Sequence, residues 1–220
     1  MPTSQPAATR EMATLAQLTN DVAGWLDRRD VGPLIPGWIS MAEADMRQML
    51  RARCMVVKAT QQIDAPLISL PADFATMASI RDLTTGKLLK LEDDYTGPLY
   101  GDGSCPVTSY RLQGDCIEFL PHPYIPDPPQ LSWAPQPIEM TWFRAPQPLQ
   151  DPQDTNPVLE QHYACYLFGT CKYGGMFELD DDRATQMDAA FIKAVTAVNM
   201  WFETSTYSGA PLRAAPMRAF

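Results

Sequence analysis

Apolar residues recur at intervals of three and four in several long stretches of the sequence, a spacing that is typical of amphipathic α-helices. We predict helices over residues 14–29, 36–53, 157–173 and 180–203. The last of these has the widest apolar stripe, which consists of Ala184, Met187, Phe191, Val195, Val198 and Phe202 and is extended by Ile192 and Trp201. A stripe of this width has to be covered, so the helix needs packing partners.

The first two predicted helices carry start and stop signals. Thr14 and Gln17 form a capping box, and Gly32-Pro33 breaks the chain before Pro36, which suits a first helical turn. The apolar faces are Leu15, Leu18, Val22, Trp25 and Leu26 in the first helix and Ile39, Ala42, Met46, Met49 and Leu50 in the second. Because the break is short, we expect the two helices to form an antiparallel hairpin.

The later helices are marked in the same way. Asn156 and Pro157 suit the cap and first turn of a bulky, largely apolar helix, which we expect to stop at Gly174-Gly175. Residues 180–182, three successive aspartates, stand where the next helix begins. Carboxylates at that position cap free amides and meet the positive end of the helix dipole. We therefore interpret this acidic run as a cap and not as a metal cluster.

Between the two helix pairs, the pattern changes to the alternation and β-branched content of strands. Strands are predicted within residues 55–63, 66–70, 77–82, 87–91, 110–112, 116–120 and 138–143. Gly114 lies between two of them and suits a tight hairpin loop. The alternation in the last strand places Ile138, Met140 and Trp142 on one face, and Glu139, Thr141 and Phe143 on the other.

This order of elements predicts an α+β fold. The N- and C-terminal helices should form an antiparallel helical bundle into which a small antiparallel β module is inserted, followed by an extended C-terminal tail. The predicted boundaries are residues 14–54 and 156–203 for the helical core, 55–145 for the β module and 204–220 for the tail. Prolines punctuate residues 121–157, and since proline cannot donate to a strand ladder, we expect edges and loops there.

Charge and composition narrow the possible roles. The formal net charge of -9 argues against broad binding to nucleic acid or to an anionic membrane, because both require a basic surface. We find no apolar run of the roughly 20 residues needed to span a bilayer and no basic, apolar leader in the first ten residues, so we expect a cytoplasmic protein. The 5 cysteines are an odd set without metal-site spacing, which favours reduced thiols.

No catalytic constellation emerges from the residue types. His122 and His162 are the only histidines, residues 92–94 form a second acidic run that suits a solvated turn, and the glycine-rich residues 101–104 lack the lysine of a phosphate loop. We expect no metal, no cofactor and no enzymatic activity. An alternative function is a carbohydrate- or peptide-binding module that uses Trp133, Trp142 and Tyr124. The same aromatic residues also suit an ordinary strand core.

Short motifs along most of the chain, taken in order, resemble those of the head-to-tail adaptor proteins of tailed phages and phage-like gene transfer agents. The early motifs are Thr14-Leu15-Ala16-Gln17, Val22-Ala23-Gly24-Trp25-Leu26, Ile35-Pro36 and residues 41–47. The later ones are Leu70-Pro71-Ala72-Asp73-Phe74, residues 114–121, Thr141-Trp142-Phe143, Thr155-Asn156-Pro157, residues 180–182 and Gly209-Ala210-Pro211-Leu212-Arg213. Arg10 and the residues before it match nothing in that family.

The resemblance implies a structural virion protein, assembled in the host cytoplasm, that forms a ring of twelvefold symmetry beneath the portal protein. Such a ring extends the DNA channel, lets genomic DNA pass without specific binding and contacts the next tail protein, a nozzle or tail tube. It also implies that the C-terminal segment reaches the portal. The residues of that segment expected to bind are Leu212, Arg213, Met217, Arg218 and Phe220. Apolar side chains with arginines on a flexible segment can become ordered on a partner that carries acidic groups.

Overall fold

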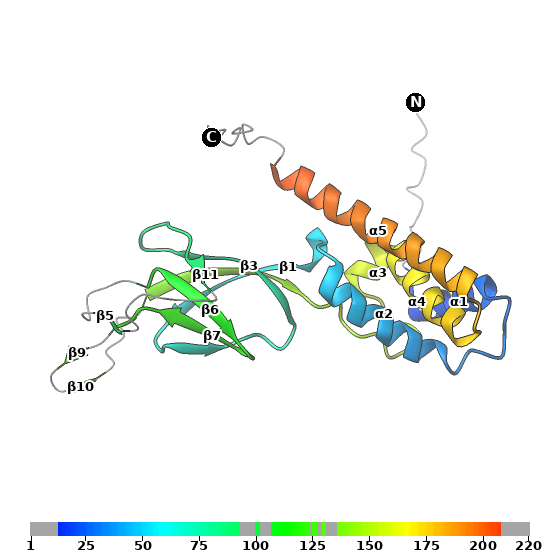
Figure 1. The fold of residues 1–220 in the computed structure, drawn as a ribbon, viewed down its shortest axis with the longest axis horizontal. Coiled ribbons are helices and arrows are strands. Elements are labelled where there is room, and N and C mark those ends of the chain that lie inside the picture. The colour runs from blue at the N-terminus through cyan, green and yellow to red at the C-terminus, as the bar shows by residue number, and fades with distance from the viewer. Residues whose placement is uncertain are drawn as a thin grey trace, which may run out of the picture. The chain divides into compact units, whose positions relative to one another are not determined.

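The computed structural model describes residues 13–92, 100–101, 107–123, 125–126, 129–130 and 136–207. The chain divides into two units, and the fold is mixed α+β, as predicted. The helical unit comprises Met1–Cys54 and Pro148–Phe220, and the β unit comprises Met55–Gln147 (Figure 1). The leading and trailing parts of the chain are joined where the Leu15 and Ala16 amides donate to the Asp154 and Pro152 carbonyls, each at 2.9 Å.

The described helices of the helical unit are α1 (Leu15–Trp25), α2 (Ile35–Met49), α3 (Pro157–Gln161), α4 (Tyr163–Phe177) and α5 (Asp181–Tyr207). Helix α4 packs against α1, α2 and α5, whereas α1 and α2 touch each other only slightly. The predicted hairpin of the first two helices is therefore wrong in detail, because each packs mainly on α4. The most deeply buried residues of α4 include Cys165, Tyr166 and Cys171.

Three helix caps predicted from the sequence are confirmed. The Thr14 hydroxyl accepts a hydrogen bond from the Gln17 amide at 3.3 Å, and the Asn156 side chain accepts one from the Leu159 amide at 2.8 Å. At the start of α5, the Asp180 carboxylate accepts from the Arg183 amide at 3.0 Å. Each side chain satisfies an amide that has no partner within its helix.

The predicted ends of the helices are less accurate. Helix α1 ends at Trp25 and not near Arg29, because Asp27 has a φ of 53° and the Arg28 amide turns back to the Ala23 carbonyl. Helix α2 ends at Met49, before the expected Arg53. Four side chains that we placed on apolar faces are exposed, which corrects that prediction: Trp25, Met49, Ile192 and Trp201.

The helix expected over residues 157–173 is two helices. His162 has a φ of −132° and a ψ of 47°, so α3 ends there and α4 begins in a new direction. The predicted stop at Gly174-Gly175 is also wrong, since α4 continues to Phe177. These glycines serve close packing: a Cβ at Gly174 would lie 2.5 Å from Leu26 Cδ1, and one at Gly175 would lie 3.0 Å from the Ala184 nitrogen.

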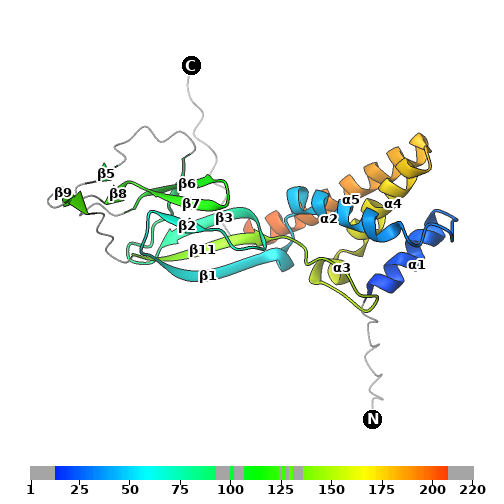
Figure 2. The ribbon, with the colours of Figure 1, turned by 90° about the horizontal axis from the view of Figure 1, so that it is seen from below.

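The β unit contains two main sheets and two short strand pairs among the described residues. The first sheet has the order β1 (Val56–Ile63), β11 (Gln136–Arg144), β3 (Phe74–Asp82), all antiparallel (Figure 2). The second has the order β2 (Leu67–Ser69), β7 (Cys116–Leu120), β6 (Ser109–Gln113), β4 (Lys90–Leu91). The short pairs are β5 (Tyr100–Gly101) with β8 (His122–Pro123), and β9 (Ile125–Pro126) with β10 (Pro129–Gln130). A 3-10 turn, η1 (Arg53–Met55), precedes β1.

Strand pairing confirms part of the predicted β module and corrects part of it. Gly114 has a φ of 59° in the β6–β7 hairpin, and Ile138, Met140 and Trp142 of β11 are all buried. The module is not wholly antiparallel, because β4 pairs with β6 and β5 with β8 in parallel. Of the strand expected over residues 87–91, only Lys90–Leu91 is regular. The ladder has a register shift after Thr141, and Phe143, expected on the face opposite Trp142, is buried as well.

We predict that Gly175→Ala destabilises the protein by about 1–3 kcal/mol, because the new methyl group would push the α5 backbone at Ala184 away from α4. A Cβ at Gly37 in α2 would have no heavy atom within 4 Å, so Gly37→Ala is the matched control. It should stabilise by up to about 1 kcal/mol through helix propensity. Urea denaturation measures both; equal shifts in the two variants would contradict this account of the glycine.

Candidate functional site

The residues predicted to bind the portal lie outside the described part of the chain. This applies to Leu212, Arg213, Met217, Arg218 and Phe220, and the structure places none of them. Trp133 and Tyr124 of the alternative aromatic site also lie outside it. The remaining member, Trp142, is buried in the core of the β unit beside Ile80 and Phe119. Trp142 is therefore a core residue and presents no face to a carbohydrate or peptide.

The described cysteines are free thiols, and the two on α4 are buried. Burial raises the pKa of Cys165 to about 11 and that of Cys171 to about 12. Both are therefore protonated at neutral pH and poor nucleophiles. Burial also lowers the pKa of His162, so this side chain is largely neutral at pH 7. Cys165 and Cys171 therefore have the properties of packed core residues, and His162 is half-buried.

The corner between α4 and α5 has an irregular backbone. The Asp180 amide donates to the Gly175 carbonyl at 3.2 Å and the Leu179 amide to the Met176 carbonyl at 3.3 Å, which is a Schellman closure. Leu179 occupies its left-handed position with a φ of 56°. Met176, Phe177 and Leu179 all expose their side chains there. Apolar exposure of this kind is common at sites of protein association.

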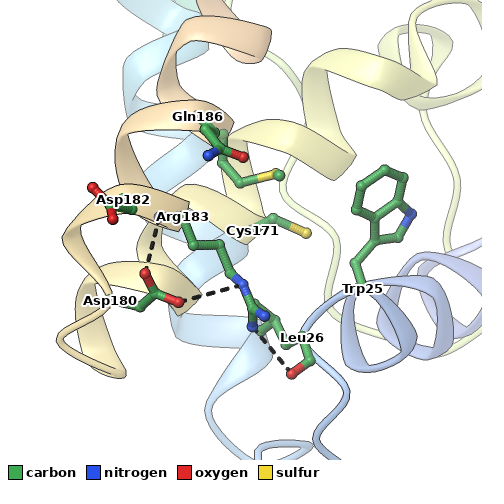
Figure 3. Close-up of a pocket in the computed structure, with 8 residues that line it drawn as sticks. Trp25, Leu26, Cys171, Asp180, Asp182, Arg183 and Gln186 are labelled. Carbon is green, nitrogen blue, oxygen red and sulfur yellow. Dashed lines mark hydrogen bonds and ion pairs between the residues drawn. The ribbon is translucent and has the colours of Figure 1, made fainter.

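Beside this corner is an open pocket of about 370 Å³ (Figure 3). Arg183 extends from α5 across its floor and donates to the Leu26 carbonyl at 3.4 Å, while its guanidinium also pairs with Glu178 and Asp180. Trp25 lines the opposite side, with its ring edge against Phe168. The Arg183 guanidinium is already paired with carboxylates of this chain. The pocket therefore resembles an ordinary junction between packed helices more than a ligand site.

A buried polar chain links α2, α3 and α4. The Asn156 amide nitrogen donates to the Tyr166 hydroxyl at 2.7 Å, and that hydroxyl lies 3.1 Å from Glu43 Oε1. Burial raises the pKa of Glu43 to about 7, although hydrogen bonds from Tyr166 and the Leu149 backbone oppose the shift. Glu43 therefore changes its charge near neutral pH within the helical unit.

We predict that Glu43 makes folding stability fall as pH rises from about 4.5 to 7. The unfolded carboxyl loses its proton near 4.5 and the folded one only near 7, so the folded state is favoured where both are protonated. Glu43→Gln should remove this dependence. Thermal denaturation at pH 5 and pH 8 checks the prediction: the variant should gain stability relative to the unaltered protein at pH 8. A constant difference between the two pH values would refute it.

Among the described residues, none of the helices could cross a lipid bilayer, and no three potential metal-ligating side chains lie close together.

Comparison with known proteins assigns the chain to a family. A search of curated proteins found no significant match. The sequence model of the SU10 adaptor protein family matches residues 13–215, which include α1 to α5 and the β unit as well as Leu212 and Arg213. The chain therefore belongs to the SU10 adaptor protein family, a family of phage head-to-tail adaptors.

Proposed function

We propose that the protein forms a ring beneath the portal, extends the DNA channel and connects the head to the tail. As a member of its family it is a structural component of a phage particle, and the match over residues 13–215 is the observation that carries the proposal. The ring is proposed to follow the twelvefold symmetry of the portal. The net charge of -9 supports passage of DNA without adhesion, since an acidic wall repels phosphates.

We propose a separate role for each of three parts of the chain. Residues 14–54 and 156–203 would form an antiparallel helical core that makes the ring contacts, and residues 55–145 a β module that meets the next tail protein. Residues 204–220 would be the docking tail. In support, residues 210–220 contain three large apolar residues and two arginines, Leu212, Met217, Phe220, Arg213 and Arg218, and no acidic residue. Such a composition suits an apolar groove with an acidic rim.

We predict that deletion of residues 210–220 leaves a folded protein that no longer joins portal particles. The described core ends at Tyr207, so the deletion removes no contact of the helical or β unit that the structure shows. Co-sedimentation with portal particles measures joining, and circular dichroism with urea denaturation measures folding. Unimpaired assembly of the truncated protein would refute the docking role of the tail.

The matched control is deletion of residues 2–12, a segment of equal length that lies before the family match. It should leave assembly unchanged. Mass measurement of the intact protein, alone and mixed with portal, tests the ring itself. A protein whose mass distribution is the same with and without portal would contradict the proposed function.

A further inference from the structure

Leu179 stands at a position that neither the backbone nor the core explains. It is the left-handed residue of the closure that ends α4, where glycine is usual because a Cβ crowds the following carbonyl group. Its side chain is 86% exposed, so it contributes little to the burial of apolar surface. Leucine is therefore unfavourable here in the isolated protein on both counts, and a contact outside this chain would account for it.

Leu179 belongs to a patch that we name the acidic end, formed by Met176, Phe177, Leu179, Asp181 and Asp182. Phe177 is 55% exposed, and its ring rests on Trp38 with the centroids 5.7 Å apart. Asp181 and Asp182 are exposed, and no described residue forms an ion pair with either. The acidic end therefore presents exposed apolar side chains next to two negatively charged aspartates.

A second patch, the basic end, lies where α2 ends beside the second half of α5. The Asn199 side chain joins these helices there, because it donates to the Met49 carbonyl at 2.9 Å and accepts from the Arg51 amide at 2.7 Å. In Figure 1, α2 and α5 both run toward the upper left of the helical unit and end there. We define the basic end by its exposed residues, which are Met49, Met200, Trp201, Arg47, Arg53 and Lys193.

The two ends are complementary but cannot meet within one copy. Leu179 lies just before the start of α5 and Met200 lies in its second half, roughly 30 Å away at 1.5 Å per residue. Each end combines exposed apolar side chains with a net charge: Asp181 and Asp182 are negative, whereas three basic residues outnumber the exposed Glu203 at the basic end. A contact between unlike ends of two copies is heterologous, so repeating it generates a ring when the rotation closes.

We propose that the acidic end of one copy docks onto the basic end of the next copy, with Leu179 set against the exposed apolar side chains of that end. This inference rests on the proposed ring function and names the surfaces that hold the ring together. The apolar side chains would supply most of the affinity, because exposed ion pairs are individually weak. The opposite charges would set the direction in which copies follow one another.

Leu179→Gly separates an association role from a folding role. Glycine adopts the left-handed conformation without a penalty, so the variant should unfold at a urea concentration equal to or higher than the unaltered protein. Its portal-dependent ring formation should need at least about tenfold more protein, which corresponds to about 1.4 kcal/mol. Met41→Ser is the matched control, since Met41 is 50% exposed on α2 and belongs to neither end. Ring formation by Leu179→Gly at the unaltered concentration would overturn the proposal.

Charge reversal tests the pairing of the two ends. Asp181→Lys with Asp182→Lys, and separately Arg53→Glu with Lys193→Glu, should each weaken ring formation while circular dichroism shows a folded protein. The variant with all four changes should recover it, because the two ends are again opposite in sign. Absence of recovery, or full assembly of either half-reversed variant, would overturn the proposed contact.

The unaltered protein distinguishes this inference from the function on which it rests. Mass photometry with portal particles is run first on that protein. If no ring forms, the proposed adaptor function fails. If a ring forms and the Leu179 and charge variants form it equally well, the function stands and the proposed surfaces are wrong.

Discussion

The helical unit depends on the close approach of α4 to its neighbours. A Cβ at Gly169 would lie 3.1 Å from Ala42 Cβ and from the Phe191 ring, and the positions at Gly174 and Gly175 are as tight or tighter. The absence of side chains at these points lets α1, α2 and α5 reach the α4 backbone. Because close packing leaves little free volume, a single added methylene group is felt there. The placement of α1, α2 and α5 follows from this contact.

Carboxylates from neighbouring helices pair with the buried polar side chains Lys172 and Tyr166 of α4, whereas the buried Thr170 hydroxyl has no hydrogen-bond partner among the described residues. Lys172 lies 2.7 Å from Asp45 and 3.3 Å from Asp188, with the Phe191 ring 5.2 Å from its ammonium group. Burial opposes its charge, but the hydrogen bonds and charges of its partners, chiefly Asp45 and then Asp188, together outweigh burial and raise the pKa of Lys172. Tyr166 relies on Glu43 in the same way, but there burial prevails and the carboxyl is only partly ionised near neutral pH.

Local chemistry made much of this fold predictable. The caps at Thr14, Asn156 and Asp180 and the hairpin at Gly114 require only neighbouring residues, so the sequence alone predicts them. Tertiary contacts decided the rest. Gly174 and Gly175 have the composition of a helix stop, yet they lie inside α4 because other helices approach them. The parallel pairing of β4 with β6 likewise depends on chain segments that the alternation pattern does not relate to each other.

The candidate functional residues also differ in whether the sequence alone could reveal them. The apolar and basic residues of the tail are visible from composition, and whether they bind the portal stays a prediction. The acidic end was missed because Leu179 looks like one more apolar residue after a helix. Its sequence signal is an isolated leucine between Glu178 and Asp180, where glycine or asparagine would suit the turn. Only the φ of 56° together with the exposed side chain identifies it.

The proposed contact between copies also explains how assembly could wait for the portal. A few exposed apolar side chains with surface ion pairs form a weak interface, because each exposed pair contributes at most about 1 kcal/mol and association carries its own entropic cost. Two free copies would then stay apart at low concentration. Copies whose tails are held on one portal meet at a much higher effective concentration, so the same weak contact becomes sufficient. In this scheme the tail and the two ends of the helical unit have separate roles: the tail recruits each copy, and the acidic and basic ends close the ring.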